Sequence, residues 1–107
     1  MTLVTSFFLE VTEGPAAGAS IALDLSPVVI VGRDLTCTFR IDDPRSSRRH
    51  FLLERSGSLL LLRDLKSRNG TRVNGAKIDE AYLIDGDVIQ VGAACFKVHG
   101  LFVRPGP

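Results

Sequence analysis

The sequence predicts an all-β fold, namely an antiparallel-dominated β-sandwich of about eleven short strands. Short runs that are apolar, or that alternate between apolar and polar residues, recur along the chain. Glycine, proline, asparagine and aspartate separate these runs about every eight to twelve residues, as they do in sandwich proteins. No stretch has the periodicity of a convincing amphipathic helix. A length of 107 residues suits one domain with a core of its own.

Four strands are expected in the first half of the chain, at residues 7–11, 20–25, 28–31 and 39–41. The second alternates apolar with small or polar residues, as a half-buried strand does. The third is a β-branched block that suits a sheet core. Turn residues interrupt the pattern at Gly14–Gly18, at Pro27 and at Asp42-Asp43-Pro44, and these breaks define the ends of the strands.

Five further strands are expected at residues 51–55, 59–62, 88–91, 94–98 and 101–103. Ser56-Gly57-Ser58 predicts a hairpin between the first two, and the leucine run 59–62 is too short for a helix. Asn74-Gly75 suits the positive φ angles of a type I′ turn, and Asp85-Gly86 is expected to repeat that turn. We therefore interpret residues 1–107 as a single domain, with a core over about 7–103 and a tail or linker at 104–107.

Composition excludes several classes of protein. Hydrophobic residues make up 45% of the chain and charged residues 23%, which is typical of a folded globule and not of a disordered segment. No apolar tract approaches the roughly 20 residues of a membrane helix, and the first residues lack the basic and apolar regions of a signal peptide. We therefore expect a soluble, cytoplasmic chain with no role at a membrane.

The two cysteines indicate neither a disulfide framework nor a metal site. Cys37 and Cys95 are far apart in the sequence, form no CxxC motif, and have no histidine at metal-ligand spacing. Free cysteine is among the residues most often found in protein cores. We expect two buried free thiols in a reducing compartment, with no metal.

Positive charge is concentrated in the middle of the chain. Between Arg33 and Arg72 lie ten of the thirteen Lys and Arg residues and five of the twelve Asp and Glu residues. This window therefore carries a formal charge of +5, whereas the rest of the chain carries −4. A local basic surface attracts anions without making the whole chain a general polyanion binder.

Four short motifs fall within or next to this basic window: Gly32-Arg33, Ser47-Arg48-x-His50, Asn69-Gly70-Thr71 and Asn74-Gly75. In this order and spacing they resemble the forkhead-associated (FHA) domain, a phosphothreonine-peptide recognition module. The resemblance extends from about Phe7 to Val103. It implies an eleven-stranded β-sandwich with recognition loops at one end, which bind a phosphothreonine in an extended peptide.

The chemistry of the motif residues suits a phosphate ligand. An arginine at the end of a strand, such as Arg33, offers a forked and permanently charged donor, and the Ser47 hydroxyl can donate one short hydrogen bond. Arg48 and Arg68 would extend the positive field to the phosphate. Asn69 offers both a donor and an acceptor, so it can hold the peptide main chain on either side of the phosphoresidue, as the resemblance implies.

A second group of residues is expected to form the scaffold of the loops: Gly32, His50, Gly70, Thr71, Asn74 and Gly75. The resemblance implies that His50 braces the loop that carries Ser47. Gly70 would supply a backbone angle that a β-carbon obstructs. Ser46 departs from the family pattern, which has an apolar residue at that position, and we expect its polar side chain to loosen the loop.

The resemblance implies an adaptor in Ser/Thr kinase signalling, which uses no cofactor. Its partner would be a phosphothreonine-containing protein or peptide, either a Ser/Thr kinase or a substrate of one. It also implies a preference for phosphothreonine over phosphoserine. The same fold could instead bind an unphosphorylated partner or a second copy of itself, and binding that survives removal of the phosphate would identify that alternative.

Two other classes of function have little support in the sequence. Ser47 and His50 could suggest a nucleophile and a base, but no orienting acid, nucleophile elbow or metal motif accompanies them, so we expect no catalysis. The basic loops could attract nucleic acid, but only two aromatic residues, Phe39 and Phe51, lie within the basic window. A platform for base stacking is therefore not evident.

Overall fold

The computed structural model describes residues 7–23 and 27–106. In this part of the chain it contains eleven strands and no helix. The strands are β1 (Phe8–Glu13), β2 (Ser20–Ala22), β3 (Val28–Gly32), β4 (Phe39–Arg40), β5 (Phe51–Ser56), β6 (Leu59–Asp64), β7 (Thr71–Val73), β8 (Ala76–Ile78), β9 (Glu80–Tyr82), β10 (Val88–Val91) and β11 (Ala94–His99). The predicted all-β fold is confirmed.

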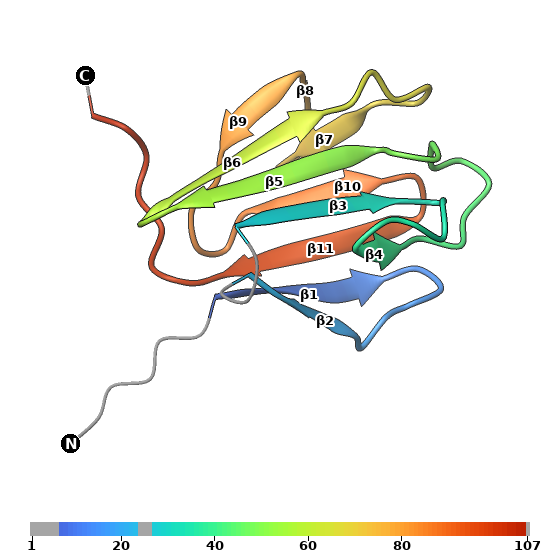
Figure 1. Cartoon of the computed structure of the whole chain (residues 1–107), viewed down its shortest axis with the longest axis horizontal. Helices are drawn as coiled ribbons and strands as arrows, with labels where there is room; N and C mark the ends of the chain where they lie inside the picture. Colours follow the sequence, from blue (N-terminus) through green and yellow to red (C-terminus); the bar gives the residue numbers. More distant parts are fainter. Residues whose placement is uncertain (1–6, 24–26, 107) are drawn as a thin grey trace.

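The strands form two sheets that pack face to face as a sandwich (Figure 1). The six-stranded sheet has the order β2-β1-β11-β10-β7-β8, and the five-stranded sheet has the order β4-β3-β5-β6-β9. Among the described strands, β3 and β4 pair in parallel, and the other paired neighbours are antiparallel. The predicted predominance of antiparallel pairing is therefore correct.

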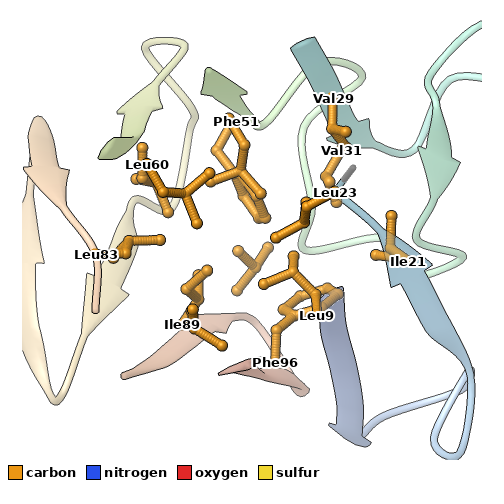
Figure 2. Close-up of a cluster of buried hydrophobic side chains, with 14 of the residues drawn as sticks. Leu9, Ile21, Leu23, Val29, Val31, Phe51, Leu60, Leu83, Ile89 and Phe96 are labelled. Carbon is orange, nitrogen blue, oxygen red and sulfur yellow. The ribbon is translucent and has the colours of Figure 1, made fainter. Parts of the chain in front are cut away.

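The core lies between the two sheets (Figure 2). Alternate residues of a strand face opposite sides, so in β5 Phe51 and Leu53 are buried whereas Glu54 is exposed. Phe51 meets Phe96 of the other sheet edge to face, with ring centroids 5.8 Å apart. Such a pair contributes about 0.5–1.5 kcal/mol beyond its buried area. A tightly packed core of this kind holds the strand ends in place, and with them the loops that follow.

One end of the sandwich gathers the connections that carry most of the motif residues (right-hand end of Figure 1). The β3–β4, β4–β5 and β6–β7 loops lie there, together with the β10–β11 turn. The segment that follows β11 runs along the opposite end. Because the loops come from both sheets, residues that are far apart in the sequence meet at this end.

The two predicted Asn-Gly and Asp-Gly turns differ. Asn74 and Gly75 have φ angles of 51° and 87°, as a type I′ turn between β7 and β8 requires. In Asp85-Gly86 the positive φ, 88°, occurs at the glycine alone, and the Asp87 N–H donates to the Ile84 carbonyl oxygen. This is the pattern of a type II turn. The segment joins β9 of one sheet to β10 of the other, so a hairpin turn does not fit there.

The predicted strand at residues 101–103 is wrong. Gly100 has a φ of 143°, and the chain leaves the six-stranded sheet at that point. Phe102 is buried, and the Val103 N–H donates to the carbonyl oxygen of Ser58, in the β5–β6 turn, at 2.9 Å. The segment therefore closes the end of the sandwich as an irregular strap.

Other boundaries differ from the prediction by a few residues. β2 ends at Ala22, and residues 24–25 of the strand that was expected there lie outside the described residues. No residue ranges were predicted for the short strands β7, β8 and β9, because a run of three residues is too short to show alternation.

The expected full burial of the two thiols is also wrong, because Cys37 and Cys95 are half-buried. Cys95 follows the buried Ala94 and precedes the buried Phe96 in β11, so it occupies an outward-facing position. Partial burial raises the pKa of both thiols. They therefore stay protonated near neutral pH.

Candidate functional site

The end of β3 packs directly against the β4–β5 loop. A Cβ built on Gly32 would lie 2.2 Å from the carbonyl oxygen of Arg48, so a larger residue would push the two apart. The Arg33 N–H donates to the carbonyl oxygen of Ser47 at 2.9 Å. The next N–H, that of Asp34, donates to the carbonyl oxygen of Arg48 at 3.0 Å. These contacts place Arg33 beside the loop that carries Ser47.

Ser47 joins the β4–β5 loop to the β6–β7 loop. Its hydroxyl oxygen accepts a hydrogen bond from the backbone N–H of Arg68 at 2.9 Å. That bond uses a lone pair of the oxygen, so the hydroxyl hydrogen remains available to donate. An anion beside Ser47 would meet an oriented O–H donor.

Asn69 makes a second link between the same two loops. Its Nδ2 donates to the carbonyl oxygen of Arg45 at 2.8 Å. The side chain is exposed, and within the described residues its Oδ1 has no hydrogen-bond partner. One bond therefore holds the amide in place, and the acceptor and the second amide hydrogen remain for a ligand.

His50 is fully buried beneath both loops. Its Nδ1 accepts a hydrogen bond from the backbone N–H of Ser47 at 3.0 Å, and its Nε2 lies 2.9 Å from the carbonyl oxygen of Gly70. A carbonyl oxygen can only accept, so these partners assign the hydrogen to Nε2 of a neutral ring. Both ring nitrogens are thus occupied by the loop backbone, and neither bonds to the Ser47 hydroxyl.

The β6–β7 loop is organised by Asp64. The carboxylate accepts hydrogen bonds from the backbone N–H and hydroxyl of Ser67 and from the hydroxyl of the buried Thr71. The Ser67 oxygen in turn accepts the N–H of Gly70, whose φ of 85° favours glycine. Partial burial alone would raise the pKa of Asp64, but the hydrogen bonds from Ser67 and Thr71 hold this pKa below its usual value.

This network predicts a loss of stability in acid that depends on Asp64. Because its pKa is lowered in the folded state, the unfolded chain binds the proton more tightly. The stabilisation is complete above the ordinary Asp pKa of 3.8, and it is lost as the pH falls through the folded value. Urea unfolding across about pH 2 to 6 should therefore show a shallower pH dependence for Asp64→Asn than for the unaltered chain. Parallel curves for the two proteins would contradict this assignment.

Three of the predicted phosphate ligands are exposed cations. The guanidinium groups of Arg33, Arg48 and Arg68 belong to exposed residues, and they form no ion pair or hydrogen bond with the residues that the structure describes. The backbone contacts above bring these arginines to the loops around Ser47. We call the five residues Arg33, Ser47, Arg48, Arg68 and Asn69 the rim.

Asn74 and Gly75 do not lie at the rim. They form the β7–β8 turn, at the end of β7 remote from Asn69. The Asn74 side chain donates to the carboxylate of Asp87 at 2.9 Å and accepts the N–H of Val88 at 3.0 Å. Their structural role is therefore to attach this turn to the start of β10.

Ser46 does not loosen its loop as was expected. The residue is buried, and its hydroxyl lies 2.7 Å from the carbonyl oxygen of Asp43, to which it donates. A buried hydroxyl with a short hydrogen bond is satisfied and fixes the loop backbone. The polar residue at this position is accommodated without an unpaired group.

Asp43 has a structural role beyond the turn that was predicted at Asp42-Asp43-Pro44. It is buried, and its carboxylate accepts the N–H groups of Arg45 at 2.9 Å and of Ala93 at 3.1 Å. These two hydrogen bonds, with the Arg45 guanidinium, hold the pKa of Asp43 below its usual value. An aspartate that bonds an N–H two residues ahead is a known turn pattern. The contact with Ala93, in the β10–β11 turn, joins residues 50 positions apart in the sequence. No short stretch of sequence could therefore have predicted it.

The described residues contain no group of three or more His, Cys, Asp or Glu side chains that could hold a metal ion. The same residues form no helix at all, so the structure contains no helix that could span a membrane within them.

Known proteins share much of this sequence. The family model of the FHA domain matches residues 29–92. The FHA domain-containing protein FhaA of Mycobacterium tuberculosis is 48% identical over 63 residues, which are 59% of this chain and 12% of FhaA. The glycogen accumulation regulator GarA of Mycolicibacterium smegmatis is 38% identical over 87 residues, which are 81% of this chain and 54% of GarA. The chain thus spans about half of GarA and a small part of FhaA.

A solved structure shares the fold. It comes from a structural and functional analysis of phosphothreonine-dependent FHA domain interactions, and it is 36% identical to this chain with a TM-score of 0.80. The superposition covers 94% of this chain and 99% of the solved one. The family match runs from β3 to the β10–β11 turn, and it includes every residue of the rim. By this agreement of sequence and fold, the chain belongs to the FHA domain family.

Proposed function

We propose that this domain binds phosphothreonine in a partner protein or peptide and acts as an adaptor in Ser/Thr kinase signalling. The observation that carries the proposal is the rim, where three exposed arginine residues lie next to Ser47 and the Ser47 hydroxyl oxygen accepts the backbone N–H of Arg68. A phosphate dianion requires several donors of fixed geometry, and charge-assisted bonds of this kind are the strong ones. The solved relative, studied for phosphothreonine-dependent interactions, supports the same proposal.

In this proposal each rim residue has a distinct task. Arg33 and the Ser47 hydroxyl bind the phosphate oxygens, and Arg48 and Arg68 add positive charge on either side. Asn69, held by its bond to the Arg45 carbonyl oxygen, binds the main chain of the peptide. The loops are fixed before the ligand arrives, because His50 bonds to both of them. A preformed site loses less ordering entropy on binding.

The proposed activity is binding without catalysis. A serine nucleophile needs a base within hydrogen-bond reach of its hydroxyl. Both nitrogens of His50 are instead engaged by the Ser47 N–H and the Gly70 carbonyl oxygen. We expect the binding partner to be a Ser/Thr kinase or a substrate of such a kinase. The two proteins would meet in the cytoplasm.

The test is a calorimetric titration with three matched peptide libraries, which carry phosphothreonine, phosphoserine or threonine at one fixed position and are otherwise degenerate. We expect the phosphothreonine library to bind and the threonine library to show no binding. Burial of one methyl group contributes about 0.8 kcal/mol, so phosphothreonine should bind about fourfold more tightly than phosphoserine.

Each outcome of this titration has a separate meaning. Equal affinity for the phosphothreonine and threonine libraries would end the proposal in favour of phosphate-independent binding. Equal affinity for phosphothreonine and phosphoserine would leave phosphate recognition intact and remove the methyl contact.

A further inference from the structure

The outer face of the five-stranded sheet is apolar, although the outward positions of a sandwich strand are normally polar. β6 begins with four consecutive leucines, of which Leu60 and Leu62 are fully buried in the core. Leu59 and Leu61 therefore point outward, where they are half-buried. A continuous apolar run is typical of a strand that is covered on both faces.

Strand register extends this apolar surface over the neighbouring strands. Leu61 is opposite Tyr82 of β9, and directly opposed residues share one face of a sheet. Leu52 points outward because it lies between two buried residues of β5, and it is opposite Ile30 of β3. We call the five residues Ile30, Leu52, Leu59, Leu61 and Tyr82 the outer patch.

The outer face of the six-stranded sheet is more polar. Its strands β1 and β11 place Glu10, Lys97 and His99 outward. The outward Phe8 is stacked on the ring of His99. The apolar outer surface is thus a feature of one sheet, and packing of the sandwich does not require it.

Charged side chains of both signs lie beside the outer patch. Arg63 forms ion pairs with Glu54 at 3.6 Å and with Glu80 at 3.3 Å. All three residues are exposed, so these pairs contribute little and can rearrange at small cost. Contacts across a two-fold axis are reciprocal, so the arginine of one copy can lie opposite a carboxylate of the other. The surface is therefore complementary in charge to itself.

A hollow of about 120 Å³ lies at the outer patch, and it is lined by Glu54, Ser56, Leu59, Leu61 and Tyr82. A cavity of about 150 Å³ can hold a benzene molecule, so this hollow has about the size of one aromatic ring. The Tyr82 side chain forms one wall and is partly exposed. Each copy thus offers both a ring and a hollow beside it, and a two-fold axis can seat each Tyr82 against the hollow of the other copy.

We propose that the outer patch is the interface of a symmetric dimer of this chain. The patch and its charges extend over four strands about 4.8 Å apart and about 20 Å long, or roughly 400 Å². A stable interface buries about 800 Å² per partner, so this dimer is weak and forms at high local concentration. The formal net charge of +1 adds little repulsion between two copies.

The dimer leaves both rims open. The β5–β6 turn, beside Leu59, lies at the end of the sandwich opposite the recognition loops (Figure 1). If the proposed function holds, the dimer offers two rims to a partner with two phosphothreonines, and binding at the second rim is then intramolecular. The dimer itself does not depend on phosphothreonine binding.

Sedimentation equilibrium without any peptide tests the proposal, over protein concentrations from about 10 µM to 1 mM, the range of a weak interface. We expect the average mass to rise from that of one chain toward that of two. Leu61→Glu and Tyr82→Ala should each weaken the dimer at least about tenfold, because both residues lie at the centre of the interface. Val88→Gln is the matched control, since Val88 and Tyr82 are both 38% exposed and Val88 lies on the other sheet. This control should still form the dimer.

Charge reversal tests whether the contacts are reciprocal. Arg63→Glu leaves three carboxylates beside the patch, and Glu54→Lys/Glu80→Lys leaves three cations there. Each protein alone should stay monomeric, because like charges meet across the axis. An equimolar mixture of the two should regain the mass of a dimer.

Each outcome supports or overturns the proposal. A chain that stays monomeric at the highest concentration overturns it, and the outer patch is then covered by a different partner. A dimer that survives both Leu61→Glu and Tyr82→Ala, or that Val88→Gln weakens equally, overturns it too. So does a mixture of the charge variants that stays monomeric. If a variant does not fold, NMR of the unaltered chain decides: amide signals of β5, β6 and β9 must shift on dilution, and constant signals there overturn the proposal.

Discussion

Replacing Arg33 with alanine is expected to weaken phosphothreonine binding by about 2 to 5 kcal/mol, the range for removing one partner of a close charge pair in an interface. The phosphate loses a permanently charged, forked donor beside Ser47. Among the described residues, the Arg33 guanidinium forms no ion pair or hydrogen bond. Folding stability should therefore change little.

Two variants sharpen the Arg33 experiment. Arg33→Lys keeps the charge and loses the fork, so its affinity should fall between the unaltered domain and Arg33→Ala. Lys97→Ala removes one positive charge from an exposed residue of β11, away from the rim, and it controls for the general effect of charge. Calorimetry with the phosphothreonine library measures all three. An Arg33→Ala affinity within about twofold of the unaltered value would contradict the assigned role.

Replacing His50 with phenylalanine is expected to destabilise the fold by about 2 to 6 kcal/mol, because two backbone groups lose their hydrogen-bond partner at about 1 to 3 kcal/mol each. These groups are the Ser47 N–H and the Gly70 carbonyl oxygen. Phenylalanine preserves much of the ring volume, so the loss reports on hydrogen bonds more than on packing. The two loops also lose their common support, and phosphothreonine affinity should fall in the variant molecules that remain folded.

The other histidine of the chain provides the control. His99 is half-buried, lies 2.9 Å from the Glu10 carboxylate and stacks on Phe8 with ring centroids 4.6 Å apart. His99→Phe keeps the stacking and removes a partly exposed polar contact, so it should cost less than about 1 kcal/mol. Urea unfolding compares the two variants. Equal midpoints for His50→Phe and His99→Phe would show that His50 does not brace the loops.

The strands that were predicted correctly are those whose own residues show an apolar pattern bounded by turn residues. Strands such as β5 and β6 contain apolar runs, and Ser56-Gly57-Ser58 between the runs is a local turn signal. The strap at residues 101–103 has the apolar composition of a strand, but the backbone angle at Gly100 directs it away from the sheet. This depends on tertiary packing, which a short window of sequence does not contain.

The rim could be predicted because its residues form motifs of recognisable order. The contacts that hold the rim residues in place could be predicted only in part. The contact of Asp43 with Ala93 joins residues on different loops, and the row of Gln90, Arg72 and Lys77 depends on the register between three strands. Register is a property of the paired strands together, so this row was not visible in the sequence.

The most direct test of the central claim is an NMR titration of the isotopically labelled domain with the phosphothreonine library. We expect backbone amide signals to change in the β3–β4, β4–β5 and β6–β7 loops, around Arg33, Ser47 and Asn69. Signals of the β5–β6 turn and the β7–β8 turn, at the other end of the sandwich, should stay unchanged. Changes confined to that other end, or no changes at the rim at saturating peptide, would contradict it.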